Sequence, residues 1–256
     1  MYLKLASLLG PEQPFLGVPW PDPALLREPF TLEDFAALEV EAIRKIQPNG
    51  PYSLGGFSAS ALAAYEASRQ LRAQGEKVSL LVLFDGENPA APLSHTSVER
   101  LNNRISSIAA RVRYHVPRLV AGGVRNILPY LRDRLEWQKY MFSVHAWSFL
   151  YRIHQQLGRP IPSWMRDSDK ILIHCYYCYQ PAPYAGRTLL FRHASRPKRD
   201  ADDPLLGWGG LCVGEFEACD VPGNHREIFI EPNVQIMAEK LSHSLEDVYE
   251  EACKEV

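Results

Sequence analysis

The sequence has no marked excess of charge of either sign. Its 28 lysines and arginines and 30 aspartates and glutamates give a formal net charge of −2. Proteins that bind nucleic acid or an anionic membrane usually carry a clear basic surplus, so neither partner is expected. No stretch reaches the length of about 18 apolar residues at which a membrane-spanning helix is considered, and Met1–Leu5 does not resemble a signal peptide. We therefore expect a cytoplasmic protein.

Metal-binding and disulfide patterns are also scarce. The chain has five cysteines, an odd number, and reduced thiols are the usual state in a chain of this kind. Cys175-Tyr-Tyr-Cys178, preceded by His174, is the one spacing that could bind a metal. Because no second Cys-x-x-Cys or spaced histidine pair completes a tetrahedral site, we expect no metal and interpret the segment as a buried wall.

The sequence does contain enough apolar material for one large core, since 46% of its 256 residues are hydrophobic. Up to about residue 92, short apolar runs alternate with amphipathic helices, starting with a helix that Thr31 can cap. Residues 52–57 are predicted to form a strand, 59–73 a helix and 78–84 a second strand. This βαβ unit predicts an α/β fold with a mostly parallel sheet and helices on both faces.

The composition changes at about residue 93. Residues 93–166 are rich in arginine and mostly helical in spacing, which indicates a helical insertion between core segments 1–92 and 167–256 of a single domain. Arginine runs of this type are usually a solvated helix face, and a docking surface for an acidic partner is the alternative.

The last elements are less uniform. Residues 188–192 and 215–221 are predicted to be strands, and Glu231-Pro232 is expected to open a closing helix. Residues 167–179 are compatible with a strand, because apolar residues alternate, or with a helix capped at its start.

The most informative motif is Gly56-Phe57-Ser58-Ala59-Ser60, where a predicted strand turns directly into a helix. A serine in such a turn is held strained above the sheet edge, and small residues on both sides let strand and helix approach. The backbone N–H of Ala59 would point at a developing oxyanion. Ser60 replaces the usual second glycine but is still small. Ser58 is therefore the candidate nucleophile, and a helix-capping serine without chemistry is the alternative.

A serine nucleophile needs a base and an acid that orients the base. Asp85 directly follows an apolar strand, so its carboxylate lies at the sheet edge where the serine must lie. His225 lies in a loop with Gly and Pro before the final helix, a setting that none of the other seven histidines shares. Asp202 and Asp203, which follow a later strand, are alternatives for the acid, and both choices keep the order Ser, Asp, His.

Several motifs in this order resemble one family, the thioesterase domains of nonribosomal peptide and polyketide synthases. The resemblance covers about residues 2–92 and 175–250 and is carried by Gly50-Pro-Tyr-Ser-Leu-Gly-Gly-Phe-Ser58, Leu71–Val78, Leu81–Asp85, Pro183–Leu189, Leu206–Trp208 and Pro222–Ile228. It implies an α/β-hydrolase fold with Ser58 as nucleophile, Asp85 as acid and His225 as base. It also implies that residues 93–166 form a lid over the acyl channel and that residues 171–179 are helical.

The resemblance further implies a thioesterase that releases an acyl, peptidyl or polyketide chain by serine acyl-enzyme chemistry, through hydrolysis or cyclisation. The substrate would be presented on the phosphopantetheine arm of an acyl or peptidyl carrier protein, and no cofactor of the enzyme's own is expected. An esterase or lipase-like hydrolase of free esters is the alternative enzyme. A non-catalytic carrier-binding module with this fold is a third possibility.

The sequence departs from the family at its start. Members of the family begin with a strand and a glycine-bearing loop that donates the second oxyanion N–H, whereas Met1–Gly10 already has helical character. That strand belongs between one expected to end near Val18 and the one ending at Phe57. Its absence predicts a missing sheet position and half an oxyanion hole, so either the protein starts upstream of Met1 or the chain is impaired.

The arginine-rich insertion allows a test of carrier docking. Reversing Arg111, Arg113 and Arg118 to glutamate is expected to slow the reaction with a carrier-bound acyl group, because opposite charges steer the encounter. The loss should shrink at high salt, since screening acts within about 10 Å at 0.1 M. A small acyl thioester without a carrier should be hydrolysed as before. Equal losses with both substrates would assign the arginines to folding, and no loss would identify a solvated helix face.

Overall fold

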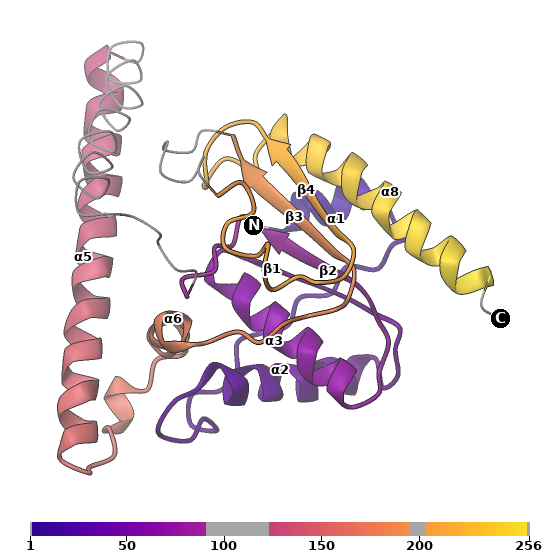
Figure 1. Cartoon of the computed structure of the whole chain (residues 1–256). Coiled ribbons are helices and arrows are strands. Elements are labelled where there is room, and N and C mark those ends of the chain that lie inside the picture. The colour runs from indigo at the N-terminus through magenta and orange to yellow at the C-terminus, as the bar shows by residue number, and fades with distance from the viewer. Residues whose placement is uncertain (1, 91–122, 195–202, 255–256) are drawn as a thin grey trace.

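The computed structural model describes residues 2–90, 123–194 and 203–254 (Figure 1). Much of the predicted lid, including Arg111, Arg113 and Arg118, lies outside these ranges, as does Asp202. The described elements are α1 (Leu3–Leu9), α2 (Leu32–Ile46), β1 (Tyr52–Phe57), α3 (Ala59–Ala73), β2 (Val78–Phe84), α5 (Gly123–Gln156), the 3-10 helix η1 (Ser163–Met165), α6 (Ser168–Cys178), β3 (Thr188–His193), β4 (Phe216–Val221) and α8 (Asn233–Lys254).

The sheet of the described residues has four strands in the order β1-β2-β3-β4, and every neighbouring pair is parallel. Helices α2 and α3 cover one face, while α1 and α8 cover the other (Figure 1). The predicted α/β fold with helices on both faces is therefore confirmed. Because all four strands run in the same direction, their carboxyl ends meet at one edge of the sheet, where ligands of such sheets bind.

Strand β2 is apolar throughout because it faces a core on each side. Leu81 and Leu83 belong to the cluster beneath α3, whereas Leu80, Val82 and Phe84 belong to the cluster beneath α8. All five residues are at most 4% exposed. This alternation is the period-two pattern of a strand that is buried on both faces.

Capping explains two of the helix boundaries. The Thr31 hydroxyl accepts a hydrogen bond from the Asp34 N–H at 3.1 Å, so α2 begins where the sequence predicts. The ambiguous segment after residue 167 is the helix α6, and the Asp167 carboxylate caps it by accepting from the N–H groups of Asp169 and Lys170. On α6, Cys175 is buried in the core, and Cys178 Sγ lies 3.8 Å from His174 Nε2.

The prediction of a strand that ends near Val18 is wrong, because residues 14–22 have no regular secondary structure. The physical reason is the sheet order. In the described residues β1 is an edge strand, so a segment two positions further out has no backbone partner with which to form a ladder. Phe15 nevertheless packs against Tyr2, with ring centroids 5.8 Å apart, and thereby joins the core under α8.

Helix α5 makes up most of the described part of the insertion, and it stands apart from the sheet beside α6 (Figure 1). Two side chains anchor its second half. Trp147 Nε1 donates to the Met165 carbonyl at 2.6 Å, and the Tyr151 hydroxyl accepts from the Phe30 N–H at 3.0 Å. The division into core and lid stays a prediction. Among the helices within the described ranges, none combines the length and apolar character that crossing a membrane requires.

A glycine substitution tests the close approach of β1 and α3. A Cβ on Gly56 would lie 2.1 Å from the Ser60 carbonyl oxygen, whereas a Cβ on Gly210 would meet nothing within 4 Å. Gly56→Ala is therefore expected to lower the free energy of unfolding by about 1–3 kcal/mol through overpacking, measured by urea denaturation. Gly210→Ala is the matched control and should be close to neutral. Equal stabilities of the two variants would contradict the tight packing of this turn.

Candidate active site

Ser58 occupies the single residue between β1 and α3. Its backbone has φ 56° and ψ −123°, a region that a non-glycine residue enters only at a cost of about 1–3 kcal/mol. Two backbone hydrogen bonds hold this conformation: Ser58 N–H donates to the Phe84 carbonyl at 3.0 Å, and the Ser58 carbonyl accepts from Ala61 N–H at 3.1 Å. The surrounding strands and helix thus fix the serine in a strained turn at the carboxyl edge of the sheet.

Asp85 follows β2 at the same edge. Its backbone N–H donates to the Phe191 carbonyl at 2.7 Å, which ties it to β3, and its side chain is 1% exposed. Burial by itself would raise the pKa of this carboxyl group. Hydrogen bonds from His193 and His225 outweigh the burial and hold the pKa well below its ordinary value. Asp85 is therefore an ionised carboxylate in a nearly dry position.

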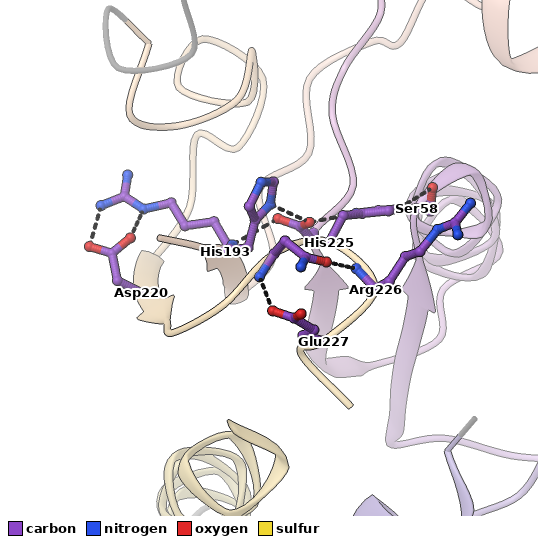
Figure 2. A network of polar contacts seen from close by, with 9 residues as sticks. Ser58, His193, Asp220, His225, Arg226 and Glu227 are labelled. Atoms are coloured by element: carbon purple, nitrogen blue, oxygen red, sulfur yellow. Dashed lines mark hydrogen bonds and ion pairs between the residues drawn. The ribbon is translucent and has the colours of Figure 1, made fainter. Parts of the chain in front are cut away.

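His225 bridges the aspartate and the serine. Its Nδ1 lies 2.5 Å from Asp85 Oδ2, and its Nε2 lies 3.1 Å from Ser58 Oγ. Its ring stacks on Phe57, with centroids 4.6 Å apart and an interplanar angle of 21°. Figure 2 shows Ser58 and His225 at the two ends of one of these contacts. The three predicted residues therefore form one hydrogen-bonded series, although they are far apart in sequence.

The loop that carries His225 is held by its own hydrogen bonds. Asn224 N–H donates to the Glu227 carboxylate at 3.2 Å, and the Asn224 side-chain oxygen accepts from Arg226 N–H at 2.9 Å (Figure 2). Asn233 at the start of α8 donates to the Glu227 carbonyl at 3.0 Å. These contacts fix the imidazole before any ligand arrives, as a preorganised base requires.

The two rival acids differ from Asp85 in their surroundings. Asp203 is exposed, and its carboxylate accepts from the N–H groups of Leu205 and Gly207, so it stabilises a turn. Asp202 lies outside the described residues. Of the three candidates, Asp85 is the one with a described contact to His225.

Ala59 is the first residue of α3, so its N–H belongs to the first turn, whose amides lack intrahelical acceptors. Its role as an oxyanion donor stays a prediction.

His193 was not among the site residues predicted from the sequence. Its Nδ1 lies 2.7 Å from Asp85 Oδ2, and its backbone N–H donates to Asp85 Oδ1 at 2.9 Å. Its position directly after the predicted strand 188–192 was the sequence signal that could have indicated a residue at the same sheet edge.

Asp85, His193 and His225 offer three potential metal ligands within 4.8 Å of one another. Two ligands of a tetrahedral zinc lie about 3.3 Å apart, so contacts of 2.5 and 2.7 Å fit hydrogen bonds better than a shared ion.

An open cavity of about 580 Å³ adjoins the His225 loop. Helices α5 and α6 and the loop line it with Glu136, Trp137, Tyr140, Asp169 and Arg226. The Arg226 guanidinium lies over the Trp137 ring, 5.4 Å from its centroid. The Tyr140 hydroxyl donates to Asp169 at 2.5 Å, and this bond joins the two helices. The cavity is thus bounded by aromatic and charged side chains next to the candidate base.

The profile of the family described as "Thioesterase domain" matches residues 1–245 of this chain. The chain belongs to the thioesterase family. The chain is 26% identical to chondramide synthase cmdD of Chondromyces crocatus over 256 residues, which cover 96% of this chain and 6% of that protein. It is 43% identical to the non-reducing polyketide synthase stmB of Aspergillus ustus over 82 residues, which cover 32% of this chain and 4% of that protein.

The thioesterase therefore spans only a small part of the length of these curated relatives, 6% and 4%. Among solved structures it is similar to the RedJ thioesterase from the prodiginine biosynthetic pathway of Streptomyces coelicolor. The TM-score is 0.55 at 18% identity, and the match covers 95% of this chain and 80% of that chain. At this identity the similarity shows the fold alone. The predicted resemblance to thioesterase domains of peptide and polyketide synthases is confirmed.

The contacts of Asp85 lead to a test of its role. Asp85→Asn is expected to slow covalent labelling of Ser58 by a fluorophosphonate by about 10⁴-fold, because an amide cannot hold His225 with its proton on Nδ1. The double variant Asp202→Asn, Asp203→Asn is the control and should be labelled at nearly the original rate. Labelling rates would be followed by mass spectrometry. Equal or reversed losses would show that the acid has been misassigned.

Proposed function

We propose that this thioesterase releases an acyl, peptidyl or polyketide chain from a carrier-protein thioester through a covalent ester on Ser58. One observation carries the proposal. Ser58 Oγ, His225 and Asp85 are joined by contacts of 3.1 and 2.5 Å, in the order that nucleophile, base and orienting acid require. Membership in the thioesterase family supports the assignment of a thioester as the bond that is cleaved.

Acylation starts when His225 Nε2 takes the proton of Ser58 Oγ and the oxygen attacks the thioester carbonyl carbon. The tetrahedral oxyanion accepts a hydrogen bond from the Ala59 N–H. When the intermediate collapses, the C–S bond breaks, and the departing sulfur takes the proton from His225. Asp85 keeps the His225 proton on Nδ1, so that Nε2 is free to act as the base.

Deacylation reverses these roles. Water, or a nucleophilic group of the acyl chain itself, gives its proton to His225 Nε2 and attacks the ester carbonyl. The C–O bond to Ser58 then breaks, and Oγ recovers the proton. Attack by water gives a free acid, whereas attack by the chain's own nucleophile gives a ring. Both outcomes use the same three side chains.

The cavity lined by Arg226, the residue after His225, is the place where the acyl chain would lie. Trp137 and Tyr140 of α5 offer aromatic surface, and α5 belongs to the segment 93–166 that we propose as the lid. Arg226, directly after the base, contacts Trp137 and so joins the lid helix to the catalytic loop. A helix in this position would shield the acyl-enzyme from water until release.

A carrier protein is the proposed partner. The two curated relatives are synthases of which this chain matches only a small part, which supports a setting with other domains. The acyl group would then arrive on the phosphopantetheine arm of an acyl or peptidyl carrier, and no cofactor of the enzyme's own enters the chemistry. Location in the cytoplasm agrees with this setting and stays a prediction.

A non-catalytic carrier-binding module is the second candidate function. It is favoured by one observation: within the described residues β1 is an edge strand, and Ala59 supplies one expected oxyanion donor without a second. Labelling by a fluorophosphonate separates the catalytic function from this one. A carrier-linked acyl thioester compared with a free ester separates a thioesterase from an esterase or lipase-like hydrolase.

The central prediction concerns Ser58. A fluorophosphonate is expected to form its adduct on this residue, located by mass spectrometry of the digested protein. Ser58→Ala should abolish the adduct and lower thioester turnover by on the order of 10⁴-fold, because it removes the atom that becomes acylated. Ser53→Ala, in the exposed part of β1, is the matched control and should keep both. An adduct on another serine would contradict the proposed triad.

A further inference from the structure

We propose that His193 is a positioning residue of the thioesterase reaction, which fixes the Asp85 carboxylate so that it can hold His225. This inference rests on the proposed function, since it concerns the orientation of the proposed base. His193 does not contact Ser58 in any described hydrogen bond, so its effect would be exerted through Asp85.

His193 binds both oxygens of Asp85. Its backbone N–H donates to Oδ1 at 2.9 Å, and its ring Nδ1 lies 2.7 Å from Oδ2. His225 Nδ1 lies 2.5 Å from the same Oδ2 (Figure 2). A carboxylate held at both oxygens cannot turn about its last bond without breaking contacts. The direction of the Oδ2 lone pairs is then fixed toward His225.

The charge of Asp85 determines the proton positions on both histidines. An ionised carboxylate only accepts hydrogen bonds, so both imidazoles must carry a proton on Nδ1. His193 and His225 therefore donate to one oxygen, with ring centroids 6.2 Å apart in an edge-on arrangement. Each oxygen of a carboxylate has two acceptor directions, so the second donor occupies the site that water would otherwise take. His193 and His225 thus each donate along one acceptor direction of Oδ2.

The sheet also fixes His193 itself. Phe84 of β2 pairs with Phe191 of β3, so Asp85, one residue after Phe84, lies near the end of β3, whose last residue is His193. His193 also pairs with Val221 of β4, just before the loop that carries His225. Its side chain is 13% exposed, compared with 41% for His225. It is therefore the more buried of the two histidines and suits a supporting role.

Burial makes this support necessary. The Asp85 side chain is 1% exposed, and a buried charge with too few hydrogen bonds is strongly destabilised. His193 supplies two of the described hydrogen bonds to this carboxylate, and His225 supplies one. Removing the His193 ring would leave a vacant acceptor on Oδ2, which water or a turned His225 could fill. Either event would weaken the alignment of His225 with Ser58.

Two substitutions separate positioning from packing. In His193→Asn the side-chain amide N–H can occupy the place of Nδ1 and keep the hydrogen bond to Oδ2. His193→Leu has an apolar side chain without a donor. Both variants keep the backbone N–H bond to Oδ1. The full chain would be compared in three measurements: the saturating rate and half-saturation constant of fluorophosphonate labelling, the low-field NMR resonance of the His225 Nδ1 proton, and the midpoint of urea unfolding.

His193→Leu is expected to slow saturating labelling by about tenfold to a hundredfold, the loss that one charge-assisted hydrogen bond predicts. The half-saturation constant should not change, because a positioning residue acts through Asp85 and not on the bound probe. The His225 Nδ1 proton resonance, assigned with His225→Gln, should shift or broaden. His193→Asn should restore most of the rate and the resonance, even if both variants unfold at similar urea concentrations.

Other results would overturn the proposal. Labelling at the original rate with an unchanged resonance in His193→Leu would mean that the ring only fills space. Equal losses of rate in both variants, in parallel with equal losses of stability, would assign His193 to folding alone. If the unsubstituted chain is not labelled at all, the proposed function fails. The resonance then decides the His193 proposal by itself, since it reports the Asp85–His225 contact without any reaction.

Discussion

The buried charge of Asp85 is the constraint on which the rest of the site depends. An ionised carboxylate with a side chain that is 1% exposed can exist only if its oxygens are hydrogen-bonded. The described groups that satisfy it come from two places: β3 supplies the His193 backbone and ring, and the loop after β4 supplies His225. Because the Asp85 carboxylate needs hydrogen-bond partners, the ends of β2 and β3 and the loop that carries His225 meet at one point.

The parallel sheet makes this convergence possible. Four strands in the order β1-β2-β3-β4 end at one edge, so Ser58, Asp85 and His193 follow or finish three adjacent strands. The buried side chains of β2 alternate between two cores and hold that edge in register. The site residues thus need no long connections of their own, because each is the continuation of a packed strand. The helices on both faces stabilise the sheet and, through it, the distances within the site.

The sequence was sufficient where local pattern decides structure. The continuous apolar run of β2, the serine between strand and helix and the cap at Thr31 predicted their elements correctly. Prediction failed where a distant neighbour decides. Within the described residues, the segment near Val18 forms no strand because the sheet order gives it no partner strand, and the α6 segment was ambiguous until its Asp167 cap and buried face were known. His193 was missed because its contact with Asp85, 108 residues away, depends on the pairing of β2 with β3. A lone histidine at a strand end gives no sign of that register.

The backbone of Ser58 also restricts which side chains can ever occupy this position. At φ 56° a residue branched at Cβ collides with its own backbone, so threonine is poorly accommodated although it carries the same hydroxyl group. Glycine fits but has no nucleophile. Among uncharged nucleophilic side chains, the turn leaves serine and cysteine, which both have an unbranched Cβ. The fold therefore restricts the residue at position 58 in two ways. The neighbouring side chains require a nucleophile, and the backbone turn requires an unbranched Cβ. Any ancestor or engineered variant must satisfy both conditions.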